Sequence, residues 1–231
     1  MRLTPAAAGT PEDAHPMWPD ADQTRELLAR AKAGDAAAVA DLLARHRDAL
    51  RRAVALRLDP ALARRVDASD IVQDVLLEAN QRLQEYLRQP TLPFHLWLRH
   101  LARDRLIDAH RFHRKAQRRS LDREQPTAPP AWAGDSSVQL LAQLLDPERT
   151  PATQAVQQEL ERRLHRAVAA LDEADREVIL MRHYEGLGNQ EVAAALGLSE
   201  AAASMRYLRA LRRLRAELVG DEGERGGVSP P

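Results

Sequence analysis

The chain has 231 residues, and its 34 Lys and Arg residues balance its 34 Asp and Glu residues, so the formal net charge is zero. Overall neutrality argues against strong DNA binding by the isolated chain, although local basic segments still permit DNA contact within a complex. The absence of Cys excludes disulfides and thiolate metal sites. No apolar run approaches the ~20 residues of a membrane span and no secretion signal opens the chain, so we expect a cytoplasmic protein without membrane insertion.

Abundant Ala, Leu and Arg, with few Gly and few β-branched residues, favour helices and predict an all-α fold. Residues 1–23 are rich in Pro, Ala and acids without hydrophobic periodicity, and we expect a disordered tail there. A helix is predicted from Thr24 to Lys32. Gly34 then ends it, and Asp35 is a good N-cap for a second helix that extends to about Val54.

Two amphipathic helices are predicted between residues 69 and 119. Pro90 and Pro93 interrupt the pattern, and Ser69 is a candidate N-cap for the first helix. Apolar residues recur at steps of three and four in both helices. In the first they are Ile71, Val72, Val75, Leu76, Ala79 and Leu83. In the second they are Phe94, Trp97, Leu98, Leu101, Ala102 and Leu106. The outer face of the first helix is acidic, which suits a protein partner, and that of the second is basic, which suits phosphates.

Residues 120–152 are rich in Pro, Gly and Ser and predict a flexible linker, with one short helix at Ser137–Leu145. A coil of this length spans about 30 Å, and about 100 Å when extended. The linker therefore divides the chain into two small helical domains, at residues 24–119 and 153–218, that can sit well apart on an elongated ligand. Residues 219–231 are a second tail that we expect to be disordered.

The second domain has the layout of a helix-turn-helix. Asn189 is a candidate cap for a short Ala-rich helix, Gly197 allows a sharp turn, and Ser199 can cap the long Arg-bearing helix that follows. The N-terminal part of such a second helix enters the major groove of DNA. An ordinary pair of helices with a solvated Arg face would share this spacing.

The sequence does not support a metal site, an enzyme active site or a cofactor site. His110 and His113 have no third ligand at a sensible spacing, so no metal site is expected. Phe94 and Trp97 lie at helical spacing and are more typical of a core than of a base-stacking surface. No Gly-rich phosphate loop and no nucleophile motif occurs, so we expect neither an enzyme nor a cofactor.

Taken together, residues 24–218 resemble a sigma factor of bacterial RNA polymerase, of the small two-domain extracytoplasmic-function (ECF) type. The segments that carry the resemblance are AGDAAAVADLLARH, ASDIVQDVLLEANQRL, FHLWLRHLARDRLIDAHRFHRK and LDEADREVILMRHYEGLGNQEVAAALGLSEAAASMRYLRALRRLR. The first three are similar to domain two of the family and the last to its domain four. The resemblance implies binding to core polymerase through the β′ clamp and the β flap, contact with promoter DNA, and restraint by an anti-sigma regulator.

The resemblance also implies roles for individual residues. The positions that match the motif docking on the β′ clamp are Asp70, Gln73 and Asp74. Those that match the segment that packs, orients and reads the −10 element are Phe94, Trp97, Arg103, Asp104 and Asp108. Its basic end, which holds DNA, is matched by Arg111, Arg114 and Lys115. The helix that reads the −35 element is matched by Ser199, Glu200, Ala201, Ala202, Ala203, Ser204, Arg206, Tyr207 and Arg209.

Two positions depart from the family pattern. The family usually has Asn where this chain has Asp104, and it often has a basic residue where Ser204 stands. The −35 sequence preference of the family therefore cannot be assigned to this chain. A stand-alone helix-turn-helix regulator is the alternative function, and it predicts tight binding to duplex DNA without polymerase.

Overall fold

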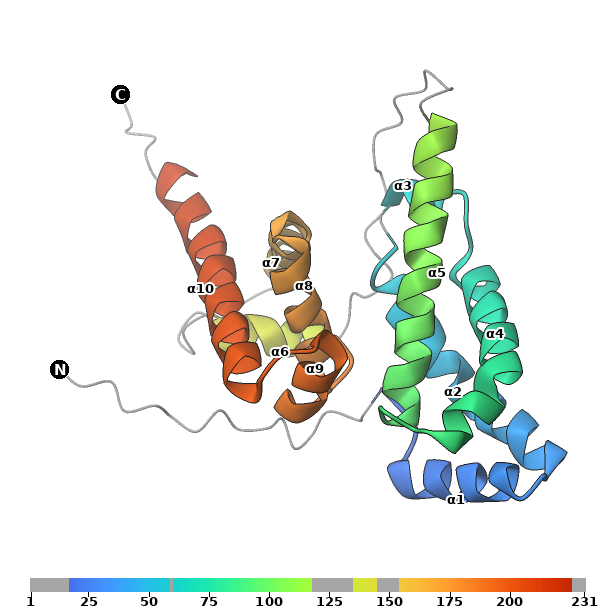
Figure 1. The fold of residues 1–231 in the computed structure, drawn as a ribbon. Coiled ribbons are helices and arrows are strands. Elements are labelled where there is room, and N and C mark those ends of the chain that lie inside the picture. The colour runs from blue at the N-terminus through green and yellow to red at the C-terminus, as the bar shows by residue number, and fades with distance from the viewer. Residues whose placement is uncertain (1–16, 59, 118–134, 145–153, 226–231) are drawn as a thin grey trace, which may run out of the picture.

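The computed structural model describes residues 17–58, 60–117, 135–144 and 154–225. The regular elements of these residues are helices, which confirms the predicted all-α class. Figure 1 shows them as two neighbouring sets. We call the described part of 17–117 the N-terminal helix group, and that of 135–225 the C-terminal helix group. In the part of the chain that is described, no helix is both long and apolar enough to span a bilayer.

The helices of the N-terminal helix group are α1 (Ala21–Lys32), α2 (Ala36–Ala55), α3 (Pro60–Ala63), α4 (Ala68–Arg88) and α5 (Phe94–Gln117). Asp35 caps α2 as predicted, because its carboxylate accepts hydrogen bonds from the N–H groups of Ala37 and Ala38 at 2.9 and 3.1 Å. The prediction that Ser69 caps α4 is wrong. Asp67 is the cap, and it accepts from the N–H of Ser69 at 2.7 Å. Its charge also complements the helix dipole.

The start of the chain also differs from the expectation of a tail through residue 23. α1 begins at Ala21 instead of Thr24, because the carboxylate of Asp20 accepts from the first free N–H groups of the helix. Trp18 is buried, with 6% of its surface exposed. The rest of the expected tail, residues 1–16, lies outside the described residues.

The core of the N-terminal helix group lies where α2, α4 and α5 meet (Figure 1). Its large, fully buried side chains include Leu42, Leu50, Leu83 and Leu98. Burying each such side chain contributes roughly 1.5–3 kcal/mol relative to exposure. This packing fixes the relative rotation of α4 and α5, and so decides which of their residues face outward.

The C-terminal helix group contains α6 (Asp135–Leu144), α7 (Gln154–Ala170), α8 (Glu173–Ile179), the π-helical turn η2 (Leu180–Tyr184), α9 (Asn189–Leu196) and α10 (Glu200–Arg225). α6 corresponds to the short helix predicted within the linker. Its residues Leu140, Leu141 and Leu144 are buried against Leu164 and Leu214 of the same group. The rest of the predicted linker lies outside the described residues.

The turn between α9 and α10 has the predicted geometry. Gly197 has a φ of 64°, in the left-handed region that favours glycine. Ser199 caps α10, since its hydroxyl accepts from the N–H of Ala202 at 3.2 Å. The prediction that Asn189 caps α9 is wrong: the cap is Gly188, whose N–H donates to the Glu191 carboxylate at 2.8 Å.

The two helix groups are in contact through α5 and α9, where Nε2 of His95 on α5 lies 3.0 Å from Oε1 of Glu191 on α9. Val192 and Ala195 of α9 belong to the same apolar cluster as Phe94 of α5. Conversely, a residue of the N-terminal helix group enters the other core: Leu56, at the end of α2, packs into the core of the C-terminal helix group. The two groups therefore share buried surface, which the flexible linker did not lead us to expect.

His46 makes the stability of the chain depend on pH. Only 1% of its surface is exposed, and burial lowers its pKa from 6.5 to about 4. The unfolded chain thus binds this proton near pH 6.5 and the folded chain only near pH 4, so stability is lost as the pH falls through that window. At pH 5 the loss from this group is about 2 kcal/mol.

We expect His46→Gln to reduce the difference in free energy of unfolding between pH 7 and pH 5, measured by urea denaturation. His100→Gln, at an exposed position, is the control, and an unchanged difference in the His46 variant would contradict the assignment.

Gly197 offers a test of the turn. No atom lies within 4 Å of a Cβ added there, so only the backbone conformation opposes a side chain. We expect Gly197→Ala to lower the free energy of unfolding by about 1 kcal/mol. Gly197→Asn should cost less, because Asn tolerates the left-handed region. Chemical denaturation of both variants measures the difference, and an Ala variant at least as stable as the Asn variant would refute the argument.

Candidate polymerase and nucleic-acid interface

The predicted docking residues for polymerase lie at the start of α4. Asp70, Gln73 and Asp74 are all exposed there. Their spacing of three and four residues places them on one side of the helix. The acidic side chains also lie near the N-terminus of α4, where the helix dipole favours negative charge. The structure thus presents these three residues together as one polar surface.

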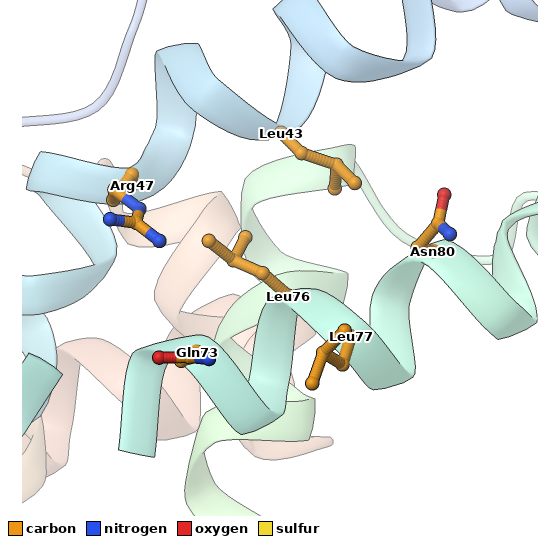
Figure 2. Close-up of a pocket in the computed structure, with 6 residues that line it drawn as sticks. All are labelled: Leu43, Arg47, Gln73, Leu76, Leu77 and Asn80. Carbon is orange, nitrogen blue, oxygen red and sulfur yellow. The ribbon is translucent and has the colours of Figure 1, made fainter. Parts of the chain in front are cut away.

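An open groove adjoins this surface between α2 and α4. It is lined by Leu43, Arg47, Gln73, Leu76, Leu77 and Asn80 (Figure 2). Leu77 is 55% exposed, and with the half-buried Leu43 and Leu76 it forms a small apolar surface in the groove. Because Gln73 lines the groove as well as the acidic surface, the two features are continuous.

The groove was not predicted from the sequence, although Leu77 is visible there as an apolar residue outside the apolar stripe. Leu77 falls outside the apolar stripe of α4 and lies three residues beyond Asp74, on the acidic side of the helix. A single exposed leucine is common on protein surfaces, and it indicates a contact surface only as part of a contiguous apolar patch. Leu43 and Arg47 of α2 could not be identified in this way, because their place beside α4 depends on tertiary packing.

The predicted −10 residues on α5 divide into an inner and an outer set. Phe94 is 3% exposed, and its ring centroid lies 5.0 Å from that of His46 in an edge-to-face arrangement. Trp97 is half-buried and stacks on Tyr86 with centroids 4.6 Å apart. Such aromatic pairs stabilise packing. Phe94 and Trp97 therefore hold α5 in position, and Phe94 is not available to a ligand in this conformation.

The outer set faces solvent along the middle of α5. Its exposed residues are Arg103, Asp104, Asp108 and Arg111. Arg105 also lies on this helix, but its guanidinium donates to the Glu78 carboxylate of α4 at 2.9 Å, so it links the two helices. Arg114 and Lys115, which match the DNA-holding end of the family motif, also belong to α5, but their side chains are not described.

The predicted −35 residues on α10 also fall into an outer and an inner set. Glu200, Ala201, Ala202 and Arg209 are exposed, and Ser204 and Arg206 are half-buried. Ala203 is fully buried, because its small side chain lets α10 approach α9 closely. Ala203 therefore supports the helix-turn-helix from inside and does not reach its surface.

Tyr207 faces the C-terminal helix group itself. Its hydroxyl donates to Gln143 of α6 at 3.2 Å and lies 2.7 Å from Nε2 of His183. Arg182 lies over its ring, 5.3 Å from the centroid. Burial raises the pKa of Tyr207 and lowers that of His183 to about 4, so both groups are neutral near pH 7. These contacts orient α10 and were not visible in the sequence.

A second interaction missed by sequence analysis joins the two helices of the motif. Asn189, predicted as a cap, instead donates from its side-chain amide to the carbonyl of Glu200 at 3.0 Å. The hydrogen bond ties the start of α9 to the start of α10. No cluster of His, Asp or Glu that could hold a metal ion occurs within the described parts of the chain, and the side chain of His113 lies outside them.

Comparisons with known proteins agree with this arrangement. Residues 161–214, from α7 to α10, match the family described as Sigma-70, region 4. The sigma factor CnrH of Cupriavidus metallidurans is 30% identical over 200 residues, which span 87% of this chain and 96% of CnrH. The ECF sigma factor SigD of Mycobacterium tuberculosis is 29% identical over 195 residues, which span 84% of this chain and 82% of SigD.

Two further comparisons add to these. The probable sigma factor RfaY of Xanthomonas campestris is 38% identical over 160 residues, and the match spans 69% of this chain but only 36% of that longer relative. The solved structure of CnrH in complex with the cytosolic domain of CnrY superposes with a TM-score of 0.54 and 27% identity, over 87% of this chain and 99% of CnrH. The chain therefore belongs to the ECF type of RNA polymerase sigma factors, a non-enzymatic branch of the sigma-70 family whose members bind core RNA polymerase and recognise promoters.

Proposed function

We propose that this chain directs core RNA polymerase to promoters with −10 and −35 elements, using a different helix group for each element. The observation that carries the proposal is the acidic surface of α4 beside the open groove, because it offers a protein contact that is separate from the candidate DNA surfaces of α5 and α10. In this proposal the N-terminal helix group is sigma domain two and the C-terminal helix group is sigma domain four.

The start of α4 is the proposed contact with the β′ clamp. Asp70 and Asp74 are exposed carboxylates that suit a basic partner, and the groove with Leu77 provides adjacent apolar area. A polar rim beside a small apolar surface is the usual composition of a protein interface. The resemblance to the family supports the same position and adds a contact of core polymerase through the β flap.

The outer set of α5 is the proposed −10 surface. Capturing an unstacked base offsets the few kcal/mol that unstacking costs, so the strand can be opened without hydrolysis. Arg103 and Arg111 suit phosphates, whereas Asp104 and Asp108 suit hydrogen-bond donors on bases. Phe94 and Trp97 are proposed to position this surface through the packing of α5.

The exposed N-terminal part of α10 is the proposed −35 surface. Arg206 and Arg209 lie three residues apart and so project from neighbouring positions of the helix. Glu200, Ala201 and Ala202 occupy the first turn, which in helix-turn-helix proteins lies nearest the bases. Ala203 and Tyr207 support the helix from its inner side.

We also infer a regulatory protein partner and a cytoplasmic location. CnrH was solved with the cytosolic domain of CnrY, which supports restraint of this chain by a protein of the same kind. Core polymerase and promoter DNA are cytoplasmic partners, so a protein that acts on both must reach the cytoplasm.

Reversing the charges at the docking surface tests the contact with polymerase. We expect Asp70→Arg combined with Asp74→Arg to weaken binding to core polymerase at least about tenfold, because like charges would then face the partner. Binding is measured by titrating core polymerase with the labelled chain. Glu26→Arg with Glu85→Arg makes the same change in net charge at exposed positions of α1 and α4 and serves as the control. Equal affinities for the two double variants would rule out this docking surface.

Truncating Arg206 tests the −35 surface. With core polymerase present, we expect Arg206→Ala to weaken promoter binding by about 1–3 kcal/mol and to relax discrimination at one −35 base pair. Arg212→Ala, further from the turn on the same helix and exposed, should have a smaller effect. The measurement is a competition assay with promoters altered at single −35 positions. Unchanged discrimination in the Arg206 variant would reject the assignment, and tight polymerase-independent binding to duplex DNA would favour the stand-alone regulator.

A further inference from the structure

Four charged side chains meet at the boundary between the two helix groups. Arg57 follows α2 and Arg99 lies on α5, whereas Glu177 lies on α8 and Glu185 follows η2. Arg57 Nη2 lies 2.8 Å from Glu177 Oε1, and Arg99 Nε lies 3.3 Å from Glu185 Oε1. Arg57 also pairs with Glu185, and Arg99 with Glu177. We call these four residues the intergroup ion cluster.

The intergroup ion cluster is largely withdrawn from solvent. The side chain of Glu185 is 0% exposed, that of Arg99 is 5% exposed and that of Arg57 is 13% exposed. Burial would raise the pKa of Glu185, but Arg57 and Arg99 outweigh it and hold that pKa below its usual value. Burial lowers the pKa of Arg99 to about 10, so it stays charged near pH 7. Two cations and two anions are thus balanced inside the boundary, and neutralising any one leaves an excess of the opposite charge among these buried groups.

The segment before α1 joins the same site. The indole N–H of Trp18 donates to Glu185 Oε2 at 3.3 Å, and its ring centroid lies 5.6 Å from that of His95 on α5. The carbonyl of Met17 accepts from Arg52 of α2 at 2.9 Å. Met17 also packs against the apolar clusters of both helix groups. Residues 17–18 therefore contact both sides of the boundary.

The boundary leaves most proposed binding residues accessible. Asp70, Gln73 and Asp74 are exposed on α4, and the outer set of α5 and the first turn of α10 are exposed as well. Contact between the groups therefore does not cover the individual surfaces. It instead fixes how far apart the two DNA-binding surfaces lie.

That separation conflicts with the proposed function, on which this inference rests. The −10 and −35 elements lie about two helical turns apart, or roughly 70 Å at about 34 Å per turn. Nε2 of His95 on α5 lies 3.0 Å from Oε1 of Glu191 on α9, and the outer set of α5 ends 16 residues after His95, about 24 Å along the helix at about 1.5 Å per residue. Because Asn189 of α9 is bonded to Glu200 of α10 at 3.0 Å, the outer set of α5 and the first turn of α10 lie well within 70 Å of each other. A promoter occupied at both elements requires that the groups separate.

We propose that the intergroup ion cluster, together with Trp18, holds the free chain in a closed state that must open before both promoter elements can be bound. Charged residues suit this reversible contact. After separation, the guanidinium and carboxylate groups regain hydration, whereas a wholly apolar contact of the same size would leave only unfavourable surface exposed. Each step of polymerase or promoter binding that favours the open state then shifts the population away from the closed one.

Distance measurements between two dyes test this proposal on the full chain. Because the chain has no Cys, Gln81→Cys on α4 and Ala216→Cys on α10 provide unique labelling sites, both at exposed positions. In single-molecule energy transfer without polymerase, we expect one predominant population with high transfer efficiency. Glu185→Gln keeps the size of the side chain and an acceptor for Trp18 but removes the charge, and it should raise the ratio of open to closed molecules at least about tenfold.

Two further variants keep the test decisive if Glu185→Gln fails to fold. Trp18→Phe removes only the indole N–H and should raise the open fraction to a smaller extent. Glu177→Arg should open the chain, because it replaces an anion with a third cation beside Arg57 and Arg99. Circular dichroism establishes that each variant is folded. Glu173→Gln, exposed on α8, is the control and should leave the ratio unchanged.

The outcomes separate this proposal from the proposed function. If the chain fails to bind core polymerase but Glu185→Gln opens it, the function is wrong and the closed state stands. If Glu185→Gln and Glu177→Arg are folded and leave the ratio of open to closed molecules unchanged, the intergroup ion cluster does not hold the closed state. High transfer efficiency that persists in a polymerase complex bound at both promoter elements would overturn the requirement for opening.

Discussion

The buried carboxylate of Glu185 is the constraint around which the two halves of this sigma factor are arranged. It accepts from Trp18 and pairs with Arg57 and Arg99, so three segments far apart in the sequence converge on one side chain. A buried ion of this kind is tolerated only with its partners in place. Its position is set by η2, where the N–H of Glu185 bonds to the carbonyl of Leu180 at 3.0 Å, five residues earlier. This wider turn rotates the residues that follow, which turns Glu185 toward the N-terminal helix group.

Each proposed binding surface is an exposed row of side chains supported by buried ones from the same segment. On α5, Phe94 and Trp97 anchor the helix in an aromatic cluster while Arg103 and Asp104 face solvent. On α10, Ala203 is buried at the contact with α9 while Arg209 is exposed. A family motif therefore mixes residues that touch the ligand with residues that hold the helix. Substitutions in the two sets should have different consequences, affinity in the first and stability in the second.

Local signals predicted the elements well, and tertiary contacts account for most of what was missed. Asp35 and Gly197 were predictable because a cap and a left-handed turn depend on a few adjacent residues. Ser69 was a wrong choice of cap because Asp67, two residues earlier, offers a stronger acceptor. Arg99 lies within the second amphipathic helix predicted between residues 69 and 119, whose outer face is basic, but it is buried beside Glu177 through a contact between residues 78 positions apart. No sequence periodicity could reveal that pairing.

We propose that this chain directs core RNA polymerase to its start sites through two physically separate DNA contacts. In vitro transcription with core polymerase and fragmented genomic DNA as template measures this role. We expect discrete transcripts that depend on the chain and whose start sites share one −10 and one −35 sequence at a constant spacing. Transcription that is the same with and without the chain, at every start site, would rule the role out.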